Sequence, residues 1–423
     1  MRSLGCLLAL AGALWGFQEA TLAQWKAQGQ ALKAKGDAAG ALAAFEKAAA
    51  LAPKSAELQD EVGFLLAAQN RRDEAIQRFD AAIGLKPDYA PAWYHIALAY
   101  WLKQDPNSAI PAMLKAVELD GKNAEYRFRM GAMFYEVSHD DEAVEHLKAA
   151  VAGNPERAEA WNTLGLCYQR KGDRLAARDA FRKAVDLAPA QIDFRNNLGF
   201  ILVDTGAAEQ AVAEFERILK QKPDYLAARF NIGYAWLQKG EFDKAIVQFR
   251  DVLARDPNQP AAHYDLGLAL KQKDQLDAAA QCFREALRLD PSMVEGWYTL
   301  GITAWQSGEF EETIAAMRKA IALRPGYAEA HYMLGTALKQ KGDMEDAKAE
   351  LREAIKLDPT TPGPYNTLAQ ILQVQGDRDG ARQLYAQAAE VKRKKELEQA
   401  QKLRTPAVGT MGMTLPEGHA RKQ

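Results

Sequence analysis

A stretch of 34 residues, residues 158–191, shows the pattern of apolar and polar positions that fills most of the chain. Its first half carries Trp161, Leu164 and Tyr168 three or four positions apart, with the small residue Gly165 beside them. Apolar residues at this spacing occupy one face of a helix. The first half therefore predicts an amphipathic helix that buries this face.

The second half of the same stretch predicts another helix. Ala177, Phe181 and Ala184 again follow helical spacing, and Pro189 ends the pattern because proline cannot donate a backbone hydrogen bond. Lys-Gly-Asp, centred on Gly172, separates the two halves. Glycine adopts the left-handed conformation that ends a helix, and the acidic residue after it favours the start of the next one. The same role is expected of Gly36, Gly240, Gly342 and Gly376.

This pattern returns in register eleven times. The small residue of the first helix recurs as glycine at positions 29, 63, 131, 165, 199, 233, 267, 301 and 335, with Ala97 and Ala369 in the other two repeats. The predicted repeats are residues 22–55, 56–89, 90–123, 124–157, 158–191, 192–225, 226–259, 260–293, 294–327, 328–361 and 362–395. Small residues indicate a close crossing of the two helices, and Phe181 is expected to fill the space towards the next repeat. No pair can bury its apolar face alone, so the repeats must stack.

The spacing W-x₂-L-G-x₂-Y…A-x₃-F-x₂-A…P, complete from Trp161 to Pro189, resembles the tetratricopeptide repeat family. The resemblance covers about 370 of the 423 residues. It implies an all-α fold, an α-solenoid in which antiparallel helix pairs form a right-handed superhelix. It also implies that the first helix of each pair lines a concave groove.

The positions that line this groove in the family are mainly aromatic or aliphatic in this chain. The predicted groove residues are Phe64, Tyr94, Leu98, Trp101, Phe128, Tyr135, Asn162, Asn196, Phe200, Phe230, Tyr234, Tyr264, Leu268, Tyr298, Ile302, Trp305 and Tyr332. Apolar surface on this scale is typical of a binding site, and the expected partner is a protein or an extended peptide. The alternative, that these residues only pack between helices, stays open.

The N-terminus has the pattern of a secretory signal peptide, predicted as residues 1–23. An apolar run, Leu4–Phe17, follows one basic residue, and the small residues Thr21 and Ala23 suit a cleavage site, with Ala20 as a second choice. The run is shorter than the roughly 20 residues of a spanning helix. The chain is therefore expected outside the cytoplasm, in the periplasm or secreted, with no stable membrane span after cleavage. A buried first helix or an uncleaved anchor is the alternative.

The C-terminus changes character after the last repeat. Residues 390–404 are strongly polar with helical composition and are predicted to form a capping extension of the final helix. Residues 405–423 contain proline and glycine throughout and are predicted to be a flexible tail.

Composition and motifs point away from catalysis and from nucleic acid. The 54 basic and 56 acidic residues give a formal charge of −2, whereas nucleic-acid binding depends on neutralising phosphates. Cys167 and Cys282 are predicted to be buried free thiols, because an exported fold that depends on disulfides carries more cysteines. Among possible metal ligands, His139, Glu142 and His146 come nearest, but acidic residues there more simply complement a helix start. No catalytic residue, metal, cofactor or small-molecule substrate is predicted.

Repeats three and four, residues 90–157, are the least regular. Pro106 falls where a second helix begins, but Pro111 predicts a kink or a late helix start. Gly121 replaces the usual proline, and Arg127 stands where tryptophan or another large residue is usual. Ordinary drift and a functional bend are the two interpretations.

These observations predict a non-enzymatic scaffold of the bacterial cell envelope that binds proteins or peptides. A cytoplasmic or membrane-tethered adaptor of an enzyme complex, such as a glycosyltransferase assembly, is the alternative.

Overall fold

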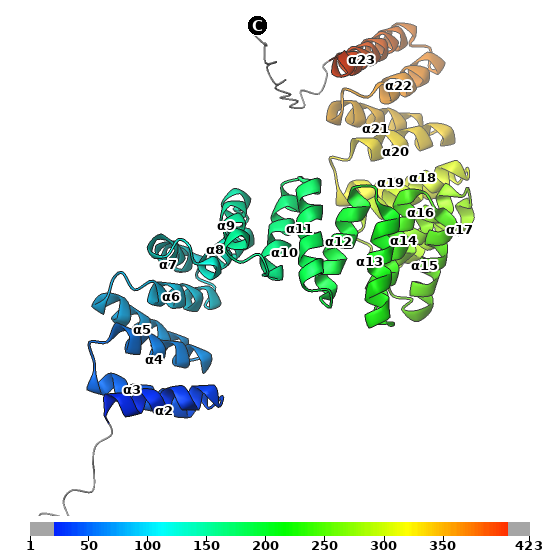
Figure 1. Cartoon of the computed structure of the whole chain (residues 1–423). Coiled ribbons are helices and arrows are strands. Elements are labelled where there is room, and N and C mark those ends of the chain that lie inside the picture. Colours follow the sequence, from blue (N-terminus) through cyan, green and yellow to red (C-terminus); the bar gives the residue numbers. More distant parts are fainter. Residues whose placement is uncertain (1–20, 405–423) are drawn as a thin grey trace, which may run out of the picture. The chain divides into compact units, whose positions relative to one another are not determined.

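The computed structural model describes residues 21–404, which form antiparallel pairs of α-helices in tandem and contain no strand (Figure 1). The first helices of the pairs are α2 (Leu22–Ala34), α4 (Ala56–Ala68), α6 (Ala90–Leu102), α8 (Ala124–Glu136), α10 (Ala158–Arg170), α12 (Ile192–Asp204), α14 (Leu226–Lys239), α16 (Pro260–Gln272), α18 (Val294–Gln306), α20 (Ala328–Lys341) and α22 (Pro362–Val374). The second helices are α3 (Ala38–Leu51), α5 (Arg72–Leu85), α7 (Pro106–Leu119), α9 (Asp140–Gly153), α11 (Arg174–Leu187), α13 (Ala208–Gln221), α15 (Phe242–Arg255), α17 (Leu276–Leu289), α19 (Phe310–Leu323), α21 (Met344–Leu357) and α23 (Arg378–Arg404). The predicted fold class, an all-α solenoid of antiparallel pairs, is confirmed.

The chain divides into two compact blocks. The N-terminal block comprises residues up to Ile218, and the C-terminal block begins at Leu219, near the end of α13. In each block, every helix packs mainly on its partner in the pair and on the adjacent helix of the next pair. Positions within a repeat are counted below from its first residue, so that Leu22, Ala56 and Ala90 stand at position 1.

The core of nine of the eleven repeats is built on a glycine that faces a large side chain, and Ala97 and Ala369 take this position in the other two. A Cβ atom on Gly165 would lie 2.6 Å from the ring of Phe181, and a Cβ on Gly29 would lie 2.6 Å from Phe45. Phe181 and Phe45 are almost fully buried. The expectation of a close helix crossing is confirmed. Phe181 was expected towards the next repeat, but its ring meets Gly165 of its own repeat, because the missing side chain leaves room for it.

The first helices of the repeats end in a left-handed residue. Every described residue with positive φ stands at position 15, and the glycines are Gly36, Gly172, Gly206, Gly240, Gly308, Gly342 and Gly376. The prediction for the five glycines named above is confirmed. Four repeats place a side chain in this conformation, at Asn70, Gln104, Ser138 and Asp274, with φ between 58° and 64°. Such residues carry strain that glycine avoids.

Acidic residues after these glycines cap only some of the second helices. Asp37, Asp173 and Asp377 each accept a hydrogen bond from the backbone N–H three residues later, at 2.8–3.1 Å. Glu241 and Asp343 make no such bond. Their charge still lies at the positive end of a helix, which is the favourable end for an acidic group.

From the second repeat onwards, a side chain at position 4 fastens each repeat to the turn before it. The Trp161 indole donates to the Pro155 carbonyl at 2.8 Å, and the Arg127 Nε donates to the Gly121 carbonyl at 2.9 Å. The same contact, six residues back, is made by Gln59, Trp93, Arg195, Arg229, His263, Trp297, His331 and Tyr365. Arg127 therefore keeps the hydrogen bond that tryptophan makes elsewhere.

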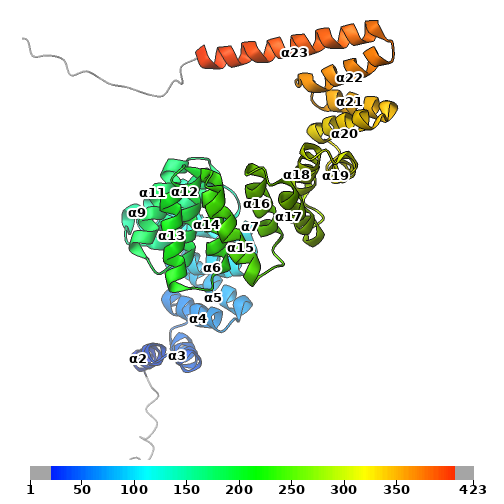
Figure 2. The ribbon, with the colours of Figure 1, turned by 90° about the vertical axis from the view of Figure 1, so that its right-hand side faces the viewer.

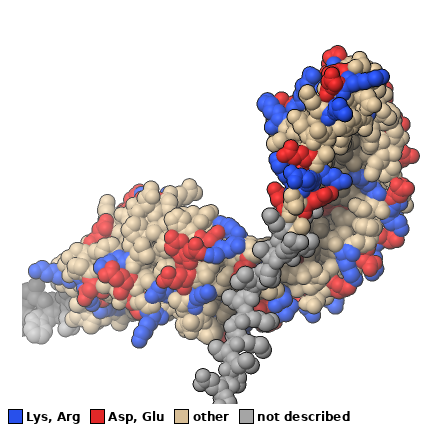
Figure 3. Space-filling model, turned by 90° about the horizontal axis from the view of Figure 1, so that it is seen from above, with Lys and Arg blue, Asp and Glu red and all other residues tan. Residues whose placement is uncertain are grey.

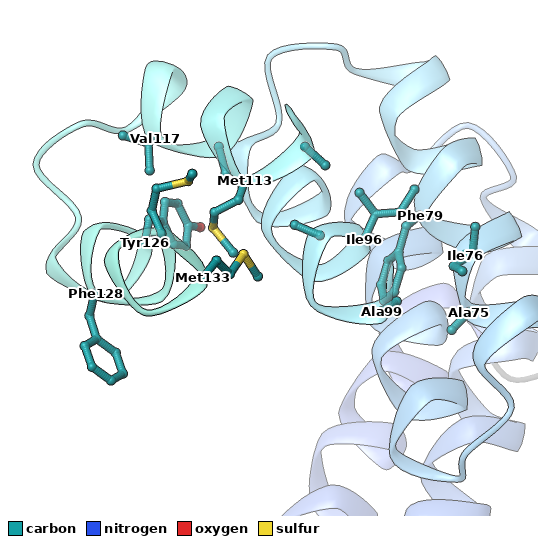
Figure 4. Close-up of a cluster of buried hydrophobic side chains, with 14 of the residues drawn as sticks. Ala75, Ile76, Phe79, Ile96, Ala99, Met113, Val117, Tyr126, Phe128 and Met133 are labelled. Carbon is teal, nitrogen blue, oxygen red and sulfur yellow. The ribbon is translucent and has the colours of Figure 1, made fainter. Parts of the chain in front are cut away.

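The irregular repeats are helical throughout. Helix α7 begins at Pro106 and continues through Pro111, so the late start, one of the two outcomes predicted from Pro111, is wrong, and the kink stays a prediction. Pro106 is at the first helical position, where its missing N–H costs nothing, and Asp105 caps the same helix by accepting from Ser108 N–H at 3.2 Å. Around Met113, the side chains of Tyr126 and Met133 converge in the core (Figure 4).

The two ends differ from the interior. Helix α23 spans 27 residues and extends well beyond α22 (Figure 2). Residues 390–404 are therefore a continuation of the last second helix. At the other end, Thr21 caps α2 and forms a capping box with Gln24. Most of the predicted signal peptide and the whole predicted tail, residues 405–423, lie outside the described residues.

Candidate functional site

The first helices of the pairs form one face of each block, called here the inner face. In the N-terminal block α4 touches α6 and α8 touches α10; in the C-terminal block α14 touches α16 and α20 touches both α18 and α22. Among the described residues, no two successive second helices make contacts of this extent. Because first helices approach each other more closely than second helices, the inner face is the concave side of each block.

The predicted groove residues lie partly open on this face. All but two of the seventeen are half-buried. Phe64 is exposed, with 40% of its surface accessible, and Phe128 is buried at 7%. Phe181, which packs between the two helices of its repeat, is by contrast fully covered. Each half-buried side chain thus has one side against the protein and one side that solvent reaches.

Phe128 belongs to the buried hydrophobic cluster of the N-terminal block, and arginines lie over its ring. Its ring points away from Met113 and Tyr126 (Figure 4), and the Arg157 guanidinium lies 4.1 Å from the ring centroid. Arg129 lies on the same ring at 5.5 Å. The groove assignment of Phe128 therefore needs a correction: the chain's own cations occupy this ring and hide it from solvent.

Glu125 holds these arginines in place. Its carboxylate accepts from Arg129 Nε at 2.7 Å, from Tyr94 Oη at 3.1 Å and from Arg157. Burial on its own raises the pKa of Glu125, but the hydrogen bonds and charges of both arginines bring this pKa below its ordinary value. Burial and the Glu125 charge raise the pKa of Tyr94 to about 12. This cluster is consequently an ionic network centred on Glu125, in which the buried Arg157 Nε alone has no hydrogen-bond partner among the described residues.

Trp101 borders a pocket in the N-terminal block. A cavity of about 230 Å³ is lined by Trp101, Gln104, Pro106, Glu136 and Val137. It lies where α6 ends against the end of α8. One aromatic wall and an exposed carboxylate make the cavity suitable for a side chain of a partner.

A row of polar contacts joins successive first helices, and only Asn162 and Tyr264 of its six members were among the predicted groove residues. The residue at position 5 contacts the residue at position 6 of the next repeat: Asp60 with His95 (2.8 Å), Asn162 with Asn197 (2.9 Å) and Tyr264 with Thr299 (3.3 Å). The polar character of position 6 was visible in the sequence, but its pairing over 35 residues was not. The row stabilises the spacing of the first helices.

Asp265 stands at position 6 without such a partner. The residue at position 5 of the preceding repeat is Phe230, which cannot hydrogen-bond. Burial raises the pKa of Asp265 to about 6. This carboxyl group is therefore partly protonated near neutral pH.

The aromatic residues of the C-terminal block rest on the second helices. Phe230 packs on Phe249 and Tyr264 on Phe283, each with ring centroids 5.6 Å apart, and Trp305 packs on Phe310 at 5.1 Å. On the face of the molecule in Figure 3, basic and acidic side chains are interspersed and leave uncharged surface between them. The inner aromatics are thus preordered by packing, which lowers the entropy cost of binding a partner.

The residues considered for metal or redox chemistry are separated or inert. His146 faces Arg127 at 3.2 Å, and burial together with this cation lowers its pKa, while His139 lies 3.8 Å from Glu142. No group of three or more candidate metal ligands occurs among residues 21–404. Cys167 is buried and Cys282 half-buried, both as free thiols. Burial raises the pKa of Cys167 to about 12, so its nucleophilic thiolate is scarce.

No helix within the described residues combines the length and apolar character that crossing a membrane requires.

Comparison with known proteins identifies the family. A family model described as the cilia and flagella-associated protein 70 C-terminal domain matches residues 185–404, just over half of the chain. Models described as tetratricopeptide repeats match residues 63–104, 90–123 and 135–192. The chain belongs to the tetratricopeptide repeat family.

The relatives found are much longer or structurally distant. Human protein O-mannosyl-transferase TMTC1 is 28% identical over 142 residues, which is 33% of this chain and 16% of that protein. The peroxisomal targeting signal receptor of Candida albicans is 28% identical over 112 residues, 26% of this chain and 19% of that protein. The chain spans less than a quarter of the length of these relatives. The crystal structure of MamA is 29% identical and covers 39% of this chain and 96% of that one, with a TM-score of 0.38.

Proposed function

We propose that this protein is a non-enzymatic scaffold that binds segments of other proteins along its inner face, and that it works in the cell envelope of a bacterium. The observation that carries the binding role is the row of half-buried aromatic and aliphatic side chains on successive first helices in both blocks. Aromatic residues that are preordered and partly open are the residues that dominate interface energetics. Repeat arrays present such rows as extended binding surfaces.

The names of two relatives support a binding role. One is a receptor for a peroxisomal targeting signal, and another, from Drosophila melanogaster, is a homolog of the BBSome complex member BBS4. Both names describe proteins that associate with others. The envelope location rests on the signal-peptide pattern of residues 1–23.

A second candidate is an adaptor that serves an enzyme complex from the cytoplasm or from a membrane anchor. The human relative is named as a protein O-mannosyl-transferase, and this chain aligns with only 16% of it. In this alternative the repeats position a catalytic partner instead of acting in the envelope.

Two measurements test the proposal. Fractionation of a chain with a C-terminal epitope tag should place it outside the cytoplasm with about the first 23 residues removed. Crosslinking followed by mass spectrometry should map partner contacts to first helices, and Trp101→Ala with Trp305→Ala should weaken them by about 2 kcal/mol. A cytoplasmic chain of full length would favour the adaptor, and contacts confined to second helices would exclude the inner face.

A further inference from the structure

The inner face of the C-terminal block carries two lysines without a carboxylate partner. Lys271 of α16 and Lys339 of α20 stand at position 12, two repeats apart, and Trp305 of α18 holds the same position between them. All three side chains are half-buried. We call these three residues the Lys-Trp-Lys row.

Comparison with neighbouring lysines shows that the lack of a carboxylate partner is unusual. Lys273 and Lys341, two residues further along the chain, pair with Asp243 at 2.8 Å and with Glu311 at 3.1 Å. Within residues 21–404, Lys271 has no hydrogen bond or ion pair, and Lys339 donates only to the Gln370 amide. Burial lowers the pKa of Lys271, and no nearby carboxylate offsets this effect. The row therefore holds uncompensated positive charge on either side of an aromatic ring.

A second row, of exposed glutamines, directly follows the first. It consists of Gln238, Gln272, Gln306 and Gln340, at position 13 of four consecutive repeats. None of the four has a side-chain hydrogen bond among the described residues. A glutamine amide both donates and accepts, which matches the N–H and C=O groups of a peptide backbone.

Contacts in the N-terminal block show how the two rows meet. There the position-13 residue Arg170 lies 4.0 Å over the ring of Tyr135, the position-12 residue of the preceding repeat. Trp101 and Glu136, at the same two positions, line a common cavity. By this register, Gln306 lies beside Lys271 and Gln340 beside Trp305.

We propose that the Lys-Trp-Lys row binds an extended acidic and apolar segment of a partner protein. Two carboxylates pair with Lys271 and Lys339, an apolar side chain contacts Trp305, and the glutamines hydrogen-bond the backbone. This inference rests on the proposed function and specifies its ligand. The axes of packed helices lie about 8–10 Å apart. Because α18 lies between α16 and α20, two such steps place Lys271 and Lys339 about 16–20 Å apart. At about 3.3 Å per residue, the two acidic residues should be five or six positions apart.

A nucleic acid is the less suitable occupant. Its affinity depends on many phosphate contacts. On first helices α14 to α22, the other lysines and arginines pair with acids: Arg229 with Asp251, Lys239 with Glu241 and Lys341 with Glu311. Two lysines without a carboxylate partner match two carboxylates of a peptide better than a continuous phosphate chain.

The test uses the full chain and two fluorescein-labelled nonapeptides of glycine and serine with leucine at position 5. One peptide has aspartate at positions 2 and 8, and the other has asparagine there. Fluorescence anisotropy at low salt should show about tenfold tighter binding of the aspartate peptide. Lys271→Gln and Lys339→Gln should each weaken it about threefold to tenfold, while the matched controls Lys273→Gln and Lys341→Gln should leave it unchanged.

The inference would be overturned by equal affinity for both peptides, or by no binding of either peptide. An equal loss of affinity in the control variants would also overturn it. So would a 12-nucleotide single strand that displaces the labelled aspartate peptide at a lower concentration than the unlabelled aspartate peptide does. Trp305→Ala separates this failure from failure of the proposed function. If both peptides bind equally and both are lost in Trp305→Ala, the acidic preference is wrong and the binding face stands. If neither peptide binds and Trp305→Ala leaves partner crosslinks unchanged, both ideas fail.

Discussion

At the scale of single residues, the choice of side chain at position 4 explains a second position in the same repeat. Where position 4 is tryptophan, position 23 is alanine, as in Trp161 with Ala180 and Trp297 with Ala316. Where position 4 is arginine or histidine, position 23 can supply a partner: Arg195 bonds Glu214 at 2.6 Å, and His331 lies 2.6 Å from Glu350. A tryptophan at position 4 thus goes with a small residue at position 23, and an arginine or histidine at position 4 can go with an acidic one. In both cases the side chain at position 4 keeps its hydrogen bond to the preceding turn.

Because Trp161 both packs its ring and donates a hydrogen bond, substitutions of this residue should have graded effects on stability. Trp161→Phe loses the hydrogen bond to the Pro155 carbonyl and should lower the free energy of unfolding by about 1 kcal/mol. Trp161→Ala also removes the ring and should cost roughly 3–5 kcal/mol. Native-state hydrogen exchange of amides in α10 and α11 measures both. Trp101→Ala, on the inner face, should cost far less stability, and the opposite ranking of Trp101 and Trp161 would reverse our assignment of faces.

Asp265 predicts a pH-dependent stability. Its pKa of about 6 in the folded chain is above the ordinary value of 3.8, so folding favours the protonated form. The resulting penalty is absent below pH 3.8, grows between pH 3.8 and 6, and is complete above pH 6. Asp265→Asn should therefore stabilise the chain by about 3 kcal/mol at pH 7.5 and by much less near pH 4. Urea unfolding of both chains at the two pH values checks this, and an equal gain at both would refute the assignment.

At the scale of helices, the turn within each repeat depends on one left-handed residue. Gln104 has φ of 59° and makes no side-chain hydrogen bond among the described residues, whereas Gly172 has φ of 79° at the equivalent position. Gln104→Gly should stabilise the chain by about 1 kcal/mol, because glycine adopts this conformation without strain. Gly172→Ala should destabilise it by a similar amount. Thermal unfolding of the two variants should shift in opposite directions.

The sequence was sufficient for the helices and insufficient for the surface they present. Glycine and proline at fixed positions predict where helices begin and end, because backbone conformation is a local property. The cover on Phe128 was not predictable, since Arg157 lies 29 residues later and reaches the ring only through its long side chain. The unpaired state of Lys271 was equally hidden, because partners in a repeat array are about 30 residues away, as with Lys273 and Asp243.

At the scale of the whole molecule, each repeat depends mainly on its neighbours. Contacts join a helix to its partner and to the next pair, so stability is a sum of repeat terms and nearest-neighbour terms. Gly165→Val tests this property, because a Cβ there would lie 2.6 Å from the Phe181 ring and force the helices of repeat five apart. Hydrogen exchange followed by mass spectrometry should show lost protection in repeats four to six and unchanged protection in repeats eight to eleven. Uniform loss across all repeats would mean that the array folds as one cooperative body. Partner binding at the Lys-Trp-Lys row should then also fail in this variant, whereas local unfolding leaves that distant row able to bind.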